Sequence, residues 1–208
     1  MRALEDRIDQ LSDRMATAHD MAEAARSLGY SEDHQILLIA KKEYDDAYAM
    51  KQEYQAIYDD LSSRWQAKRD QFPVATYVWE TLAEAGYSDT VIAGILGNMM
   101  AECGGHTLAL DWQVRGTYYG LCQWSCGYAE VWGASLEEQC EFLLSTIKYE
   151  LDTYGYMYKK GYTHDNFVSM TDIQQTALMF ARSYERCGSS THRLRQQLAV
   201  EAYNYFVS

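Results

Sequence analysis

The chain has 208 residues, a hydrophobic content of 48% and a formal net charge of −12. This is the composition of a folded protein with room for one domain and an appendage. The acidic charge without a basic stripe argues against nucleic acid as a ligand. No apolar run approaches the roughly 18 residues of a membrane span. The N-terminal MRALEDR has no hydrophobic leader core, so we expect no signal peptide, and delivery as part of a particle or of a larger protein.

The first 72 residues have the pattern of two packed helices. A seam with alternating spacings of four and three predicts the first helix, and consists of Leu4, Ile8, Leu11, Met15, Ala18, Ala22 and Ala25. After a break at 29–31, a second seam runs from Ile36 to Trp65. Residues 1–72 are therefore expected to form a coiled-coil-like helical hairpin, with self-association or partner helices through residues 4–65. Pro73 marks the boundary to a second domain, 73–208.

In residues 73–208 the helical period is broken once, between 103 and 133. Apolar spacing predicts helices over 74–85, 88–102, 135–151 and 172–185, and a last one ending near residue 205. A β-favouring aromatic stretch at 117–125 predicts a small hairpin, and the tyrosine-rich segment 155–165 is expected to be a loop. The fold class is thus mainly α with a small β-hairpin region.

The helix over 88–102 carries the most informative residue. Ser88 is an N-cap type, and Gly104 and Gly105 follow the helix as closing glycines. Glu102 ends a stripe that is otherwise apolar apart from Asn98. A helix C-terminus and apolar neighbours both disfavour a charged carboxylate, so this position favours the neutral form that a general acid needs.

Three blocks carry a family resemblance: GILGNMMAE at 94–102, YGLCQW at 119–124 and FARSYER at 180–186. In this order they resemble the phage tail lysozyme family and, more distantly, soluble lytic transglycosylases and goose-type lysozymes. The resemblance implies a lysozyme-like α+β domain that cleaves the glycan strands of bacterial peptidoglycan, with Glu102 as catalytic acid. It also implies a glycan groove containing Gln123, Tyr119 and Trp124, with Tyr184 and Glu185 near or behind it.

Several alternatives remain open at this stage. The reaction is either hydrolysis or the intramolecular transfer of a lytic transglycosylase. Asp111 is the best local candidate for a second carboxylate in the groove, although a loop aspartate more often serves turn geometry. The rival to an enzyme is a non-catalytic structural or glycan-binding module. The resemblance implies a place in a virion, or an extracellular one at the cell wall, where a phage tail or a conjugation apparatus locally opens the wall.

The chain departs from the family blocks at three cysteines: Cys103, Cys122 and Cys187. We expect Cys103 and Cys122 to be structural residues near the site. A cysteine nucleophile with His106 or His192 is the main rival chemistry, but Cys103 follows a helix C-terminus, which does not favour a thiolate. The cysteine and histidine spacings match no known zinc pattern, so no metal and no cofactor are expected.

Overall fold

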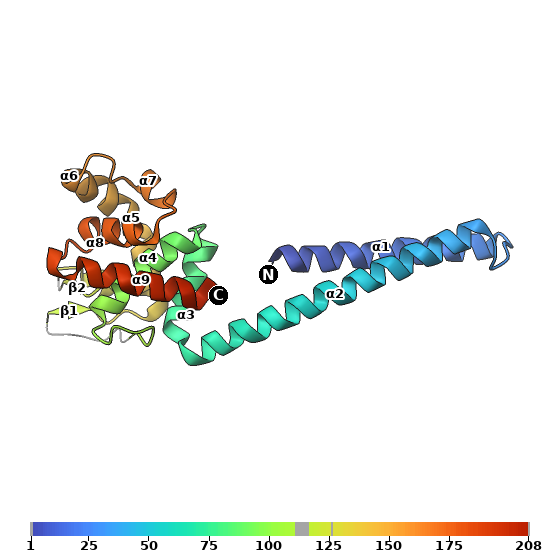
Figure 1. Cartoon of the computed structure of the whole chain (residues 1–208), viewed down its shortest axis with the longest axis horizontal. Helices are drawn as coiled ribbons and strands as arrows, with labels where there is room; N and C mark the ends of the chain where they lie inside the picture. The colour runs from blue at the N-terminus through green and yellow to red at the C-terminus, as the bar shows by residue number, and fades with distance from the viewer. Residues whose placement is uncertain (1, 111–116, 126, 208) are drawn as a thin grey trace. The chain divides into compact units, whose positions relative to one another are not determined.

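The computed structural model describes residues 2–110, 117–125 and 127–207. The chain divides into two compact units, Met1–Ala67 and Lys68–Ser208. Figure 1 shows long helices in the first unit and many short elements in the second.

The N-terminal unit is an antiparallel helical hairpin of α1 (Arg2–Ser27) and the first part of α2 (Gln35–Gln71). The hydroxyl of Tyr58 donates to Glu5 Oε1 at 2.8 Å, and Arg14 pairs with Glu43 at 2.9 Å, which fixes the antiparallel register. The predicted seam of α1 faces inward, with Leu11, Ala18 and Ala25 buried. In α2 the seam begins at the buried Leu37, because Ile36 is 36% exposed.

The second unit is built from short helices around one buried helix. Its elements are α3 (Pro73–Glu84), α4 (Asp89–Glu102), β1 (Tyr118–Tyr119), β2 (Trp124–Ser125), η1 (Ala129–Val131), α5 (Leu136–Glu150), η2 (Leu151–Gly155), α6 (Tyr156–Tyr158), α7 (His164–Val168), α8 (Ile173–Ser183), η3 (Ser189–Thr191) and α9 (His192–Val207). This mainly α architecture with one small β-hairpin confirms the fold class expected from the sequence.

Helix α4 is the centre of this unit and packs against α8 and α9 (Figure 1). Every residue from Val91 to Met100 is buried, so the helix is enclosed on all sides rather than along one stripe. Two glycines of α4 allow α8 and α9 to approach it closely. A Cβ at Gly97 would lie 2.4 Å from the backbone nitrogen of Ala199, and one at Gly94 would lie 2.7 Å from Thr176 Cγ2. Asn98, also buried, donates to the Gly94 and Ala177 carbonyls and so ties α4 to α8.

Local signals fix the helix ends and the hairpin. Ser88 accepts a hydrogen bond from the Val91 amide at the start of α4, and Ser135 and Glu138 form a complete capping box at the start of α5. Strands β1 and β2 are antiparallel, with Tyr119 opposite Trp124. These features agree with the sequence prediction because each depends on residues close together in the chain.

The segment expected to be a loop, 155–165, is partly helical. Helix α5 continues without a break through the π-helical turn η2 into α6, which ends at Tyr158. Gly155 permits this continuation, because a Cβ there would lie 2.8 Å from the Tyr162 carbonyl oxygen and 3.0 Å from Ser183 Oγ. Across the described ranges, none of the helices has both the length and the apolar character needed to cross a membrane.

Candidate active site

Glu102 occupies the last position of α4, and its carboxylate forms an ion pair with Arg195 of α9. The Arg195 side chain is only 4% exposed and that of Glu102 is 22% exposed, so the pair lies at the edge of the core. The same guanidinium donates to Asn98 Oδ1 at 3.1 Å. Because Asn98 is one turn before Glu102, Arg195 fixes the end of α4 from the side. The surroundings of Glu102 are thus less apolar than the sequence led us to expect.

The turn between β1 and β2 is held against the end of α4. Cys103 is buried, and its Sγ donates to the Leu121 carbonyl at 3.6 Å, while the Leu121 amide donates to Gln139 Oε1 at 3.0 Å. Gly120 has a φ of 84°, and a Cβ there would lie 2.6 Å from Gln139 Oε1. Glycine is therefore required at this position. In this arrangement the Cys103 thiol supplies the link between helix and turn.

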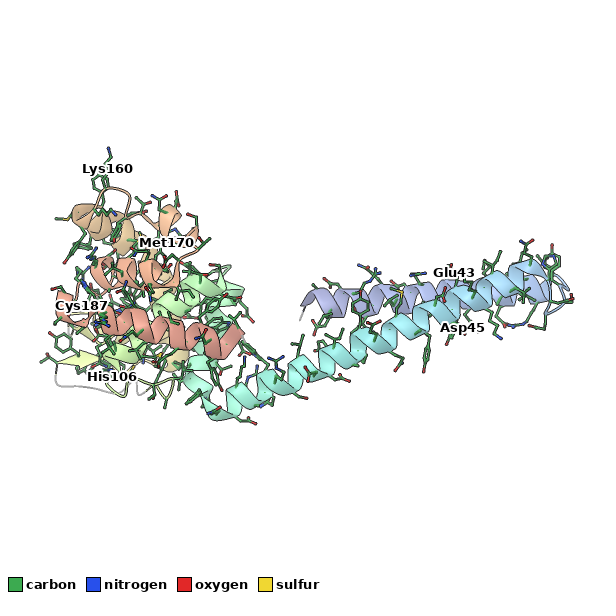
Figure 2. All side chains as sticks on the ribbon, in the orientation of Figure 1. Glu43, Asp45, His106, Lys160, Met170 and Cys187 are labelled. Carbon is green, nitrogen blue, oxygen red and sulfur yellow. The ribbon has the colours of Figure 1, made fainter. Side chains whose placement is uncertain are left out.

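Two adjoining hollows form a cleft beside this turn. One is lined by Glu102 and Cys187 together with Tyr118, Cys122, Gln123 and Glu185. The other shares these last four residues and continues along Trp124, Ser125, Tyr128, Phe142, Thr146, Glu150, Tyr184 and Arg186. We call the two hollows together the cleft. Cys187, at the Glu102 end, is labelled in Figure 2.

A hydrogen-bonded aromatic wall bounds the second hollow. Trp124 Nε1 donates to the Tyr184 hydroxyl at 3.1 Å, and that hydroxyl is 2.8 Å from Thr146 Oγ1. Phe142 meets the Trp124 ring edge-on at 5.5 Å between centroids. Burial raises the pKa of Tyr184 well above its usual range, so the phenol stays neutral. The wall is therefore rigid and carries aromatic surface, which suits a sugar ring.

At the far end of the cleft, Arg186 forms an ion pair with Glu150. Tyr128 joins the pair, because its hydroxyl is 3.4 Å from both Glu150 Oε1 and Arg186 Nη2. Arg186 has a φ of 52°, and Gln123 one of 46°. Left-handed backbone costs energy in residues other than glycine and tends to persist where function requires it. That both residues line the cleft supports its assignment as the functional site.

Glu185 differs from Glu102 and Glu150, the two ion-paired carboxylates of the cleft. Its Oε1 is buried and has no hydrogen-bond partner within the described part of the chain, although the residue as a whole is partly exposed. The two nearby arginines are paired with other carboxylates, Arg195 with Glu102 and Arg186 with Glu150. Burial, and then the charge of Glu102, raise the pKa of Glu185 to about 8. The cleft thus contains a carboxyl group that is neutral at pH 7, beside an ion-paired one.

The structure brings most of the predicted site residues together. Glu102, Gln123, Trp124, Tyr184 and Glu185 all line the cleft. The Gln123 Nε2 donates to the Gly120 carbonyl at 2.8 Å, so this end of the amide holds the turn. Tyr119 is buried and its hydroxyl donates to the Ala134 carbonyl, whereas its neighbour Tyr118 is 50% exposed and lines both hollows.

Asp111, the candidate second carboxylate, lies outside the described residues. Cys122 is buried beside Glu185, and burial, followed by the Glu185 charge, raises its pKa well above the usual range of a thiol. Cys122, Cys140 and Cys187 are free thiols. The described residues include no group of three or more histidine, cysteine, aspartate or glutamate side chains arranged to hold a metal ion.

Sequence reasoning missed Arg195, Tyr118 and the Glu150–Arg186 pair. A signal for Arg195 was present: it lies three and seven residues before Leu198 and Ala202, on the apolar stripe of the last helix. A charged residue on a buried stripe requires a partner of opposite charge. The Glu150–Arg186 pair joins residues 36 apart in the chain, and local patterns do not reveal such a contact.

Fold and cleft together define a lysozyme-like helical domain with a carboxylate at the end of its central helix. The phage tail lysozyme family model matches residues 73–206, and the chain belongs to this family. No curated protein and no solved structure matches the chain. Membership of the family supports a lysozyme-type, peptidoglycan-related function.

Proposed function

We propose that residues 73–208 form a catalytic domain that cleaves the glycan strand of peptidoglycan between N-acetylmuramic acid and N-acetylglucosamine. The observation that carries the proposal is the position of Glu102, in a cleft with Gln123, Trp124 and Tyr184. Family membership over 73–206 supports both the substrate and the extent of the domain. The family also supports a virion-associated setting, in which a phage tail opens the wall locally, with a conjugation apparatus as the alternative setting.

In this proposal the proton that Glu185 holds at neutral pH passes through Glu102 to the glycosidic oxygen, as the sugar gains oxocarbenium character, and leaves Glu185 ionised. Arg195 and Asn98 fix the orientation of the carboxyl group, and Glu185 provides a neutral carboxyl beside it. Tyr118, Gln123 and Trp124 line the path of the strand. The 2-acetamido group of the substrate offers an internal route to stabilise the cation, so a second ionised carboxylate is not required. Hydrolysis and intramolecular transfer both fit this assignment.

Clearing of purified cell walls tests the proposal, with the wild-type chain compared with Glu102→Gln. General acid catalysis contributes roughly 10²- to 10⁴-fold, so the variant should lose nearly all clearing. Glu141→Gln, at an exposed position of α5, is the matched control and should clear like the wild type. Equal clearing by Glu102→Gln would reject the assignment. Wall binding without clearing by the wild type would instead favour a non-catalytic glycan-binding module.

Among the described residues, the N-terminal hairpin contributes none of those that line the cleft. We propose that it serves as an arm for self-association or for partner helices, as its seam and its exposed apolar side chains suggest. Among these are Leu28, Leu38 and Ile39, which are 73%, 54% and 49% exposed.

A further inference from the structure

An aromatic surface lies next to the cleft, on η2 and α6. Three consecutive residues there, Tyr156, Met157 and Tyr158, are 54%, 78% and 56% exposed. Lys160, just beyond them, projects outward from the same region (Figure 2). Neighbouring large apolar side chains that remain exposed mark interaction surfaces more often than single ones do.

Part of this surface forms a hollow lined by Tyr154, Met157, Tyr158 and Arg186. We call it the tyrosine hollow. Its floor is fixed, because the Arg186 guanidinium lies 4.4 Å from the centre of the Tyr154 ring and is also ion-paired with Glu150. The hollow is thus preformed, and a ligand would meet side chains of which at least two are already ordered.

The tyrosine hollow adjoins the cleft at Arg186. Arg186 lines both of them, since it also borders the hollow of Trp124 and Tyr184. A strand that leaves the cleft over Arg186 would meet Tyr154 and Tyr158, which line the hollow on which Arg186 also borders.

The chemistry of the tyrosine hollow suits a sugar. Pyranose rings have apolar C–H faces and polar edges, and tyrosine offers a flat apolar ring with a polar hydroxyl. The charge of Arg186 is already balanced by Glu150, so the hollow does not favour an anion such as a phosphate. We propose that the tyrosine hollow is a distal subsite that binds sugar units of the same glycan strand, away from the bond that is cut. This inference rests on the proposed function and extends it.

The test measures binding in the Glu102→Gln background, where the strand stays intact. Glycan strands stripped of their peptides by an amidase are separated by length, and a tetrasaccharide and an octasaccharide are titrated by calorimetry. The octasaccharide should bind at least about tenfold more tightly than the tetrasaccharide, because only the longer strand extends into the tyrosine hollow. Adding Met157→Ala and Tyr158→Ala should remove this gain and leave tetrasaccharide binding unchanged.

Tyr156→Ala is the matched control, because Tyr156 is equally exposed but does not line the tyrosine hollow. It should keep the full gain. The subsite is rejected if the two lengths bind equally, if the gain survives Met157→Ala with Tyr158→Ala, or if Tyr156→Ala removes it as well. A gain seen only with peptide-bearing strands would assign the hollow to the peptide stem and also reject it. Tetrasaccharide binding without a gain leaves the proposed function intact, whereas no binding of either strand counts against both.

Discussion

Arg195 of α9 holds the carboxylate of Glu102 at the end of α4, and the same guanidinium donates to Asn98 Oδ1 at 3.1 Å. One buried cation therefore joins α4 and α9, the pair of helices with the most extensive contact in the domain, and orients the residue proposed to do the chemistry. Removing one partner of such a pair leaves the other group unsatisfied, which costs more than the pair itself contributes.

Arg195→Met tests this positioning role. The variant keeps much of the side-chain volume but leaves Glu102 and Asn98 Oδ1 without their donor. We expect the free energy of unfolding to fall by about 1–3 kcal/mol and the turnover of cell walls to fall at least about tenfold, with little change in KM. Thermal unfolding and wall-clearing kinetics measure the two effects. Arg193→Met, an exposed position on the same helix, should change neither; a loss confined to KM would contradict the role.

Glu185 should make the stability of the domain depend on pH. Its pKa is raised to about 8 in the folded chain, above the value near 4.5 of an unperturbed glutamate. Between about pH 4.5 and pH 8 the folded state therefore holds one proton more than the unfolded state, and stability falls as the pH rises through this window. Glu185→Gln removes this dependence.

Relative to Glu185→Gln, the wild type should thus lose a few kcal/mol of its free energy of unfolding between pH 5 and pH 8, since one pKa unit corresponds to about 1.4 kcal/mol. Urea unfolding of both proteins at several pH values measures the difference. A constant difference over this range would show that Glu185 is ionised throughout. The sign is informative as well, because a paired carboxylate with a lowered pKa would make stability rise with pH.

Gly97→Ala tests the close packing of α4 against α9. The new Cβ would lie 2.4 Å from the backbone nitrogen of Ala199 and 2.6 Å from its Cα, so the helices must separate. We expect the free energy of unfolding to fall by roughly 3 kcal/mol or more, a loss larger than the gain from the better helix propensity of alanine. Gly105→Ala, where only Thr107 Oγ1 lies near at 3.6 Å, should stay within about 0.5 kcal/mol of the wild type. Similar melting temperatures for both variants would contradict the packing.

The fold was predictable wherever neighbouring residues carry the signal. The Ser88 cap, the capping box of Ser135 and Glu138, and the left-handed Gly104 all follow from short motifs. The enclosure of α4 was not predictable from one stripe, because Gly94 and Gly97 let α8 and α9 cover its other faces. The helical continuation past residue 151 was missed for a similar reason, since the space around Gly155 is set by Tyr162 and Ser183.

For the site, family blocks brought Glu102, Gln123, Trp124 and Tyr184 to attention, and all four line the cleft. The sequence could not show whether Tyr118 or Tyr119 faces the cleft, because a short strand permits either register. The hydrogen bond from the Tyr119 hydroxyl to the Ala134 carbonyl fixes the register in the structure. It also could not show the partner of Glu102, since Arg195 lies 93 residues further along the chain.

The most direct measurement of the central claim is the identity of the new chain ends in digested cell walls. Mass spectrometry of wild-type digests should find glycan fragments that end in N-acetylmuramic acid, as a reducing sugar after hydrolysis or as an anhydro sugar after intramolecular transfer. Digests with Glu102→Gln should contain almost none. Fragments released only by cuts in the peptide cross-links, or the same glycan ends in equal yield from Glu102→Gln, would contradict the assignment of Glu102 as the acid that cleaves the strand.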